Sequence, residues 1–188
     1  MIVKVIRELG YDESTFATGL SMGITEGISF EEYCNNASIR DRMQKVCKKL
    51  CGKGNGHDNF LTGMVVWLDC TFTRDMWQEA DRYHWFQKVG SASTMHTLMK
   101  RELVKSDFTE DTDQDAIDIV NKYISTGEFS KAKANLPEGF LQRRVACTNY
   151  QQLRTMIKQR KDHKKIDWRV WSQEVVKQVN HPDMMEVV

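Results

Sequence analysis

The stretch LTGMVVWLDCTF, residues 61–72, decides the fold class of this chain of 188 residues. Its apolar side chains recur at every second position, and in an extended chain such positions lie on one side. This alternation predicts a strand with one buried face. The residues expected on the buried side are Met64, Val66, Leu68, Cys70 and Phe72.

Helices are predicted on both sides of this strand because apolar residues there recur every three or four positions. Residues 2–9 and 140–148 are predicted to be extended, and the Gly-, Ser- and Thr-rich residues 15–27 to form a loop with short turns. These elements predict a single α+β domain over residues 1–188, with long helices packed on an antiparallel sheet. The expected helices cover residues 39–51 with Ser38 as cap, a segment from the cap Thr73 to His84, a segment within 110–127, a segment capped by Asn149, and a last segment from Ile166 or Asp167.

The composition predicts a globular protein. Hydrophobic residues make up 40% and charged residues 28% of the chain, an ordinary balance for a folded domain. No apolar run approaches the ~18 residues of a membrane helix. A signal peptide has a long apolar core near its start, and the acidic residue Glu8 interrupts the first apolar residues of this chain. The five cysteines are an odd number, which favours free thiols over a disulfide framework. We therefore expect a cytoplasmic protein with no membrane partner.

The net charge of +1 averages two unlike parts of the chain. Residues 131–170 hold eleven cations and three acids, a net charge of +8, and the remaining residues carry −7. Such a cluster predicts binding of phosphate through charge-assisted hydrogen bonds. The alternative is a solvated basic face, partly neutralised by the acidic helix 110–118 of the same or another subunit.

Residues 82–96, RYHWFQKVGSASTMH, combine aromatic rings with small hydroxyl side chains. This combination suits a flat heterocycle stacked over a hydrogen-bonding loop, which is predicted over residues 90–94. In the alternative interpretation the serines only form a turn, and the aromatic residues belong to the core: Tyr83, Trp85 and Phe86.

Cys47 and Cys51 lie four residues apart on one face of the predicted helix 39–51, and His57 follows. Two thiolates and an imidazole are zinc ligands. Cys47 also belongs to the apolar stripe of that helix, however, and free cysteine is commonly buried as a small hydrophobe. Because no second ligand pair completes the site, we predict no metal.

Four segments, taken in order, carry a family resemblance. They are IRDRMQKVCKKLCGKGNGHDNF (39–60), LTGMVVWLDCTFTRDMWQEADRYHW (61–85), RYHWFQKVGSASTMH (82–96) and NLPEGFLQRRVACTNYQQLRTMIKQR (135–160). Together they resemble the flavin-dependent thymidylate synthases, which methylate dUMP with FAD, NADPH and methylenetetrahydrofolate. The resemblance implies the α+β fold of that family, FAD as cofactor, a pyrimidine nucleotide as ligand, and a homotetramer whose sites form between subunits.

The third segment departs from the family's signature, which reads Arg-His-Arg, two residues, Ser, one residue, Asn, two residues, Ser, one residue, Arg. His84 and Ser93 match it. Replacement of a signature arginine by tyrosine or methionine removes a bidentate phosphate donor. The three arginines, the first serine and the asparagine are replaced by Tyr83, Trp85, Met95, Lys88 and Gly90 in that order.

The resemblance also implies the site residues. The candidate nucleotide-binding residues are Arg160, Lys133 and Ser93, and the candidate cofactor-binding residues are His57, His84 and Asn149. No catalytic residue is assigned, because in this family reduced flavin carries the redox chemistry and the protein supplies orientation and electrostatics.

Three functions are weighed against one another. The first is methylation of dUMP, or a related reaction on a pyrimidine deoxynucleotide, in a bacterial cytosol or a phage-infected host cell. The second is a catalytically inactive relative that binds a nucleotide or a nucleic acid through residues 131–170. The third is a structural or partner-binding oligomer held by its basic and acidic parts. The C-terminal NHPDMMEVV, residues 180–188, is expected to pack on a neighbouring subunit or to remain mobile.

Overall fold

The computed structural model describes residues 2–185, and their contacts divide into two compact units. We call residues 2–3 with 69–146 the central unit, because it comes from the middle of the chain. Residues 4–68 with 147–185 form the terminal unit, from the two ends of the chain. The expectation of one domain over residues 1–188 stays a prediction.

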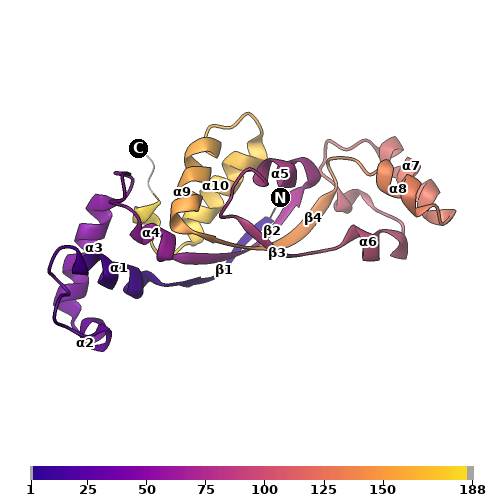
Figure 1. Ribbon diagram of the computed structural model, residues 1–188. Helices are drawn as coiled ribbons and strands as arrows, with labels where there is room; N and C mark the ends of the chain where they lie inside the picture. Colours follow the sequence, from indigo (N-terminus) through magenta and orange to yellow (C-terminus); the bar gives the residue numbers. More distant parts are fainter. Residues whose placement is uncertain (1, 186–188) are drawn as a thin grey trace. The chain divides into compact units, whose positions relative to one another are not determined.

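Four strands form one sheet in the order β1-β2-β4-β3 (Figure 1). The predicted α+β class, an antiparallel sheet with packed helices, is confirmed. The buried side of β2 is the predicted one, since Val66, Leu68, Cys70 and Phe72 are all 0% exposed. The strands are β1 (Ile2–Leu9), β2 (Val65–Thr73), β3 (Gln87–Ser91) and β4 (Leu141–Asn149).

The terminal unit packs six helices and one short turn of 3₁₀ helix. Asn149 caps α9 as predicted, since its side-chain oxygen accepts a hydrogen bond from the amide of Gln152 at 2.8 Å. The cap of α3 is Asn36 rather than Ser38, because the Asn36 side chain accepts from the amide of Ile39 at 3.1 Å. The elements are α1 (Tyr11–Leu20), α2 (Phe30–Asn35), α3 (Ala37–Leu50), α4 (Phe60–Gly63), α9 (Tyr150–Arg160), α10 (Ile166–Gln178) and η3 (Pro182–Met184).

Two predictions on this unit are wrong in part. Residues 15–20 belong to α1, where the sequence predicts a loop, and only residues 21–27 form turns. Thr15 and Thr18 donate their hydroxyls back to carbonyls one turn earlier, at 3.0 and 2.8 Å, and α1 packs against α3 and α4. This packing overrides the weak helix propensity of glycine, serine and threonine. The strand β2 also starts later than predicted, because residues 60–63 make the helical turn α4 and bury Phe60 and Leu61.

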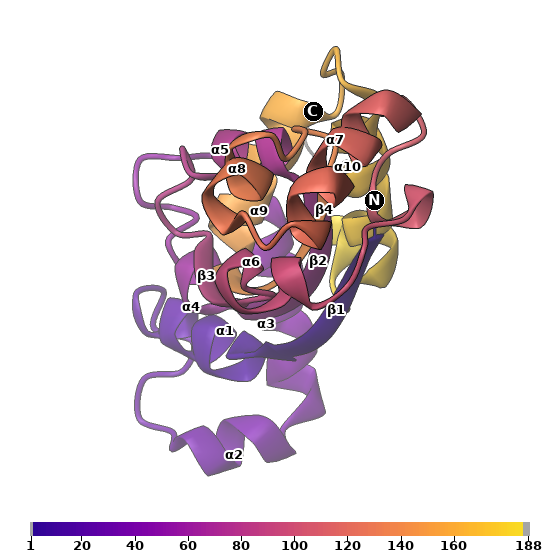
Figure 2. The same ribbon diagram turned by 90° about the vertical axis from the view of Figure 1, so that its right-hand side faces the viewer.

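The central unit has its own small core, around α7 and α8, which lie side by side (Figure 2). Its α7 has the predicted apolar stripe, with Ile117 and Val120 buried, and Gly127 follows its end with a φ of 72°. The core residues are Leu98, Leu103, Phe108, Ile117, Val120, Ala132 and Leu136. The elements are α5 (Arg74–Ala80), α6 (Thr94–Thr97), η1 (Leu98–Lys100), η2 (Lys105–Asp107), α7 (Gln114–Ser125) and α8 (Phe129–Ala134).

Two predictions on the central unit need correction. Thr73 caps α5 as expected, but the helix ends at Ala80, so His84 lies outside it. Residues 87–91 form the strand β3 instead of part of a polar loop. This strand lies at the edge of the sheet, where both faces can stay exposed, so its polar composition carries no alternation that would reveal it.

The C-terminal segment packs on its own chain through residue 185. His181 stacks on Tyr11 with ring centroids 3.7 Å apart, and Met184 and Met185 are buried. Glu8 accepts a hydrogen bond from the amide of Asn180 at 2.8 Å. The expectation of a tail that packs on a neighbour or stays mobile is therefore wrong for residues 180–185. Residues 186–188 lie outside the described part.

His181 is expected to make the stability of the protein depend on pH. Burial lowers the pKa of His181 below its ordinary value of 6.5, against the opposing pull of Glu8, Asp183 and Asp12. The folded state therefore takes up a proton less readily than the unfolded state, and stability falls as the pH drops below about 6.5. Melting temperatures from about pH 7.5 to about pH 5.5 should fall less in His181→Gln than in the wild type. His96→Gln, at an exposed histidine, should follow the wild type, and equal pH curves for all three proteins would contradict the assignment.

Candidate functional site

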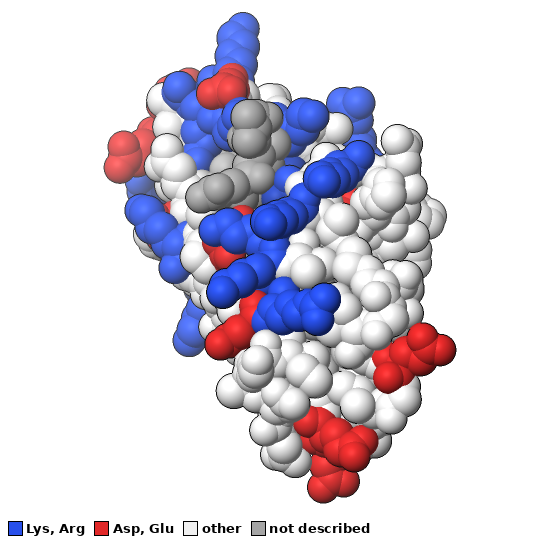
Figure 3. All heavy atoms as spheres, turned by 90° about the vertical axis from the view of Figure 1, so that its left-hand side faces the viewer, with Lys and Arg blue, Asp and Glu red and all other residues white. Residues whose placement is uncertain are grey.

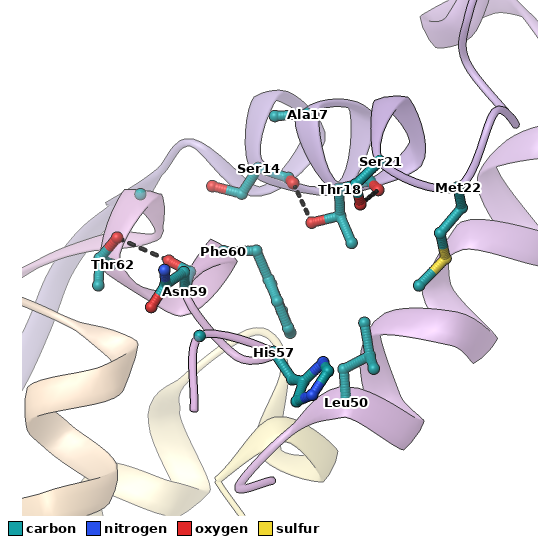
Figure 4. Close-up of a pocket in the computed structure, with 12 residues that line it drawn as sticks. Ser14, Ala17, Thr18, Ser21, Met22, Leu50, His57, Asn59, Phe60 and Thr62 are labelled. Atoms are coloured by element: carbon teal, nitrogen blue, oxygen red, sulfur yellow. Dashed lines mark hydrogen bonds between the residues drawn. The ribbon is translucent and has the colours of Figure 1, made fainter. Parts of the chain in front are cut away.

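The terminal unit holds a cavity of about 450 Å³ between α1, the end of α3, and the segment that leads into α4 (Figure 4). Its volume lies in the range of ligand pockets. The wall carries hydroxyl and amide groups beside apolar side chains, and the His57 imidazole points toward Leu50 at its edge. The lining residues that Figure 4 labels are Ser14, Ala17, Thr18, Ser21, Met22, Leu50, His57, Asn59, Phe60 and Thr62.

A glycine-rich turn places His57 at this cavity. Gly52, Gly54 and Gly56 all have positive φ angles, of 75°, 65° and 85°, which side chains disfavour and glycine adopts freely. The turn reverses the chain after α3, and the amide of His57 donates to the carbonyl of Gly54 at 3.0 Å. His57 is exposed, so its imidazole is free to meet a ligand.

Asn149 and Arg160 lie in the same unit but do not line this cavity. The Asn149 oxygen is used in capping α9. Arg160 is 6% exposed, its guanidinium lies 4.6 Å from the centre of the Trp168 ring, and Nη1 is 2.8 Å from Nε2 of His163. Arg160 is therefore packed into the unit by a cation–π contact.

The central unit gathers three cations, Arg74, Lys133 and Arg144, which we call the cationic cluster. Lys133 donates from Nζ to the hydroxyl of Thr94, the first residue of α6 after its N-cap Ser93. Burial lowers the pKa of Lys133, and the charges of Arg74 and Arg144 lower it further. Of the predicted residues, Lys133 thus contacts the residue that directly follows Ser93.

Arg144 is the least satisfied member of the cluster. Its guanidinium lies 4.7 Å from the centre of the Trp77 ring, and Nη2 donates to the Gln142 side chain at 2.9 Å. Its Nε is buried and has no hydrogen-bond partner among the described residues. Burial lowers the pKa of Arg144 as well. A buried donor without a partner is costly.

Few acids oppose the cluster. Arg74 lies 3.9 Å from Glu138 and donates to the carbonyl of Leu136. Within residues 2–185, neither Lys133 nor Arg144 makes an ion pair. The cationic cluster therefore holds positive charge that neighbouring acids offset only in part.

Arg74 and Arg144 were not singled out by the sequence. One signal could have found Arg144: neighbouring residues of a strand point to opposite faces, so the pair Arg143–Arg144 had to place one arginine on each face of β4. Arg143 binds Asp69, with a distance of 2.5 Å between Nη2 and Oδ2, and that leaves Arg144 for the other face. Arg74 carries no comparable signal, because its neighbours in the cluster are distant in sequence.

The segment around His84 is divided between core and surface. Tyr83 and Phe86 are 6% and 1% exposed, whereas Trp85 is 62% exposed. His84 is exposed too, and its carbonyl accepts from the Gln87 side chain at 2.6 Å. The core interpretation holds for Tyr83 and Phe86 and fails for Trp85. A role of His84 in cofactor binding stays a prediction.

The thiols do not favour metal binding or nucleophilic chemistry. Burial raises the pKa of Cys47 and of Cys51 to about 11, so both are protonated near neutral pH, whereas the thiolate is the ligand and the nucleophile. Among residues 2–185, no three side chains of His, Cys, Asp or Glu gather as metal ligands do. In the same range no helix is long and apolar enough to cross a membrane.

These features define an α+β protein with a four-stranded sheet, a cationic cluster in the central unit and a cavity in the terminal unit. The fold is that of the flavin-dependent thymidylate synthases. One similar structure is the flavin-dependent thymidylate synthase ThyX of Helicobacter pylori complexed with FAD and dUMP, with a TM-score of 0.78 and 14% identity, covering 99% of this chain and 98% of that one. Another structure of Helicobacter pylori ThyX with FAD and dUMP gives a TM-score of 0.77 at 12% identity over the whole of both chains. No family model matches the sequence, and no curated protein matches it significantly.

Proposed function

We propose that this protein binds a pyrimidine deoxynucleotide and FAD, and methylates dUMP or carries out a related reaction. The observation that carries the proposal is the cationic cluster of Arg74, Lys133 and Arg144 beside Ser93. Its support is the fold, which the ThyX structures with FAD and dUMP share.

The cationic cluster suits the phosphate of a nucleotide. A phosphate monoester carries nearly two negative charges at neutral pH and accepts several hydrogen bonds. Lys133 and the guanidinium of Arg144 would donate to it, and Ser93 directly precedes Thr94, the present partner of Lys133. Arg160 packs on Trp168. It is also proposed to contact the nucleotide, through the edge of its guanidinium.

The cavity at His57 fits part of a flavin. A flavin ring offers carbonyl oxygens and ring nitrogens at one edge and apolar faces on both sides. The cavity is lined by Ser14, Thr18 and Thr62 and by the apolar side chains of Leu50 and Phe60. The hydroxyls of Thr18 and Thr62 donate to backbone carbonyls, so they would accept hydrogen bonds from the ligand. FAD, when bound, supplies the redox chemistry. His57, and by the resemblance His84 and Asn149, would hold and orient the cofactor.

A homo-oligomer, a tetramer by the resemblance, and a cytoplasmic location are part of the proposal. Exposed apolar side chains on β1 support association, since Ile6 and Leu9 are 51% and 44% exposed.

A second candidate is a relative that binds the nucleotide without flavin chemistry. The observation that favours it is Tyr83, which stands where the family's signature has an arginine and is buried in the core. A side chain packed there cannot serve as a phosphate donor. The visible absorption spectrum separates the two candidates, because only the first predicts flavin bands in the purified protein or after addition of FAD.

The nucleotide site is tested by thermal shifts with dUMP. Lys133→Ala is expected to weaken dUMP binding at least about tenfold, because charge-assisted hydrogen bonds contribute about 1.5–3 kcal/mol. The matched control is Lys131→Ala on the same helix, whose side chain is 59% exposed and pairs with Glu128. It should keep the wild-type shift.

Equal dUMP shifts in the two lysine variants would refute the assignment of Lys133. A colourless protein that takes up no FAD but keeps the dUMP shift would refute the first candidate and support the second.

A further inference from the structure

The helix α3 and the turn after it carry a second concentration of positive charge. Residues 37–53 contain six cations and one acid, a net charge of +5. Figure 3 shows Lys and Arg side chains gathered in a band over α3, with acidic side chains at the lower end of the same face. The cations are Arg40, Arg42, Lys45, Lys48, Lys49 and Lys53.

Most of these cations have no counter-ion within residues 2–185. Arg40 lies 3.5 Å from Asp12 and Lys48 lies 3.6 Å from Asp183. The other four are exposed and make no ion pair within residues 2–185. We call these four the α3 basic face: Arg42, Lys45, Lys49 and Lys53.

The more basic segment, residues 131–170, is arranged differently. It is divided between the two units, and several of its cations are engaged within the chain. Lys131 binds Glu128, Arg143 binds Asp69, and Arg160 stacks on Trp168. In the terminal unit, the exposed Lys158, Lys161, Lys164 and Arg169 of this segment are spread over α9, α10 and the turn between them. The α3 basic face lies on one helix and the turn after it, outside the segment that the sequence singles out.

The geometry of α3 suits a row of phosphates. Arg42, Lys45 and Lys49 are three and four residues apart, so they share one side of the helix and rise by about 5 Å from one to the next. They line a shallow groove of about 480 Å³, together with Ser38 and the single acid Asp41. The spacing is of the same order as the rise between phosphates along a nucleic acid strand, about 3.4 Å of helix axis per nucleotide of each strand.

We propose that the α3 basic face binds the phosphate backbone of a nucleic acid duplex without reading its sequence. Single strands are held by aromatic rings on which bases stack, and α3 has no aromatic residue. A membrane surface requires apolar side chains that insert, but the apolar stripe of α3 is turned inward, with Met43 and Cys47 0% exposed. The groove itself has one apolar lining residue, the half-buried Val46. Repeated cations with no aromatic residue and no exposed apolar stripe fit a duplex backbone best.

The test is fluorescence anisotropy with a labelled DNA duplex of about 30 base pairs and arbitrary sequence, in a salt series. The wild type should bind with an affinity that falls steeply as salt rises. The triple variant R42Q/K45Q/K49Q should bind at least about tenfold more weakly at low salt, with a slope of log affinity against log salt reduced by about 2–3. The matched control K4Q/K100Q/K122Q removes the same charge from exposed lysines on other elements and should stay within about twofold of the wild type.

Three results would overturn the proposal: no binding of the duplex by the wild type at low salt, equal losses in the triple variant and its control, or equal binding of a single strand of the same length. Binding to phosphatidylserine vesicles without binding to the duplex would overturn it in favour of a lipid surface. The triple variant should keep the thermal shift with dUMP, so failure of the duplex experiment leaves the proposed nucleotide site standing.

Discussion

Trp168→Ala is expected to lower the free energy of unfolding by about 4 kcal/mol. Trp168 is 0% exposed and meets the ring of Trp171 edge to face, with centroids 5.5 Å apart. The guanidinium of Arg160 lies 4.6 Å from the centre of the Trp168 ring. The substitution therefore leaves a large cavity and also removes the ring that covers a buried cation. Urea unfolding followed by far-UV circular dichroism measures the loss.

The matched control is Trp85→Ala, which removes the same side chain at a position that is 62% exposed. It should cost less than about 1 kcal/mol, because little apolar area is buried there. A loss in Trp168→Ala no larger than in Trp85→Ala would contradict the placement of Trp168 in the core.

The contact with Trp168 changes how variants of Arg160 have to be interpreted. Because Arg160 is 6% exposed, its removal should destabilise the protein even without a ligand. A missing dUMP shift in Arg160→Ala therefore supports a nucleotide contact only if the variant remains folded at the start of the experiment. Arg160→Lys keeps the charge and loses the planar stacking, so it separates the two roles.

Local patterns predicted the parts of the fold that depend on near neighbours. The alternation in residues 61–72 gave the buried face of β2, and the Asn149 side chain capped the helix that follows it. The strand β3 was missed because an edge strand needs no apolar face. The helix α1 was missed because its stability comes from packing against α3 and α4, which is a property of the folded chain and not of residues 11–20.

The candidate site was less predictable than the fold for a similar reason. Arg74, Lys133 and Arg144 lie on α5, α8 and β4, and only the folded central unit brings them together. The family resemblance pointed to Lys133 and Ser93, which the structure links through Thr94. It could not point to Arg74 or Arg144, which belong to none of the positions that matched. A count of charges along the chain also overlooked α3. Its net positive charge was summed with the acids of all other residues outside 131–170, and that sum is negative.

Gly10→Ala is expected to lower the free energy of unfolding by about 4 kcal/mol, and to disturb the cavity at His57. Gly10 precedes α1 with a φ of 84°, and a Cβ there would lie 2.2 Å from the carbonyl oxygen of Gly63. The left-handed conformation costs alanine about 1 kcal/mol, and a clash with backbone adds about 3 kcal/mol, since the atom cannot rotate away. Relief requires α1 to move from α4, and both elements line the cavity.

Gly27→Ala separates the two costs. Gly27 has a φ of 80°, close to that of Gly10, but nothing lies within 4 Å of its Cβ position, so only the conformational cost of about 1 kcal/mol should appear. The difference between the free energies of unfolding of the two variants, from urea unfolding, then measures the cost of the clash between a Cβ at residue 10 and the carbonyl of residue 63. If FAD binds at this cavity, Gly10→Ala should also weaken its uptake, while Gly27→Ala should leave uptake unchanged. Equal stability of the two variants would show that the backbone at Gly10 and Gly63 moves apart at a small cost in free energy. The close contact between them would then not hold α1 against α4.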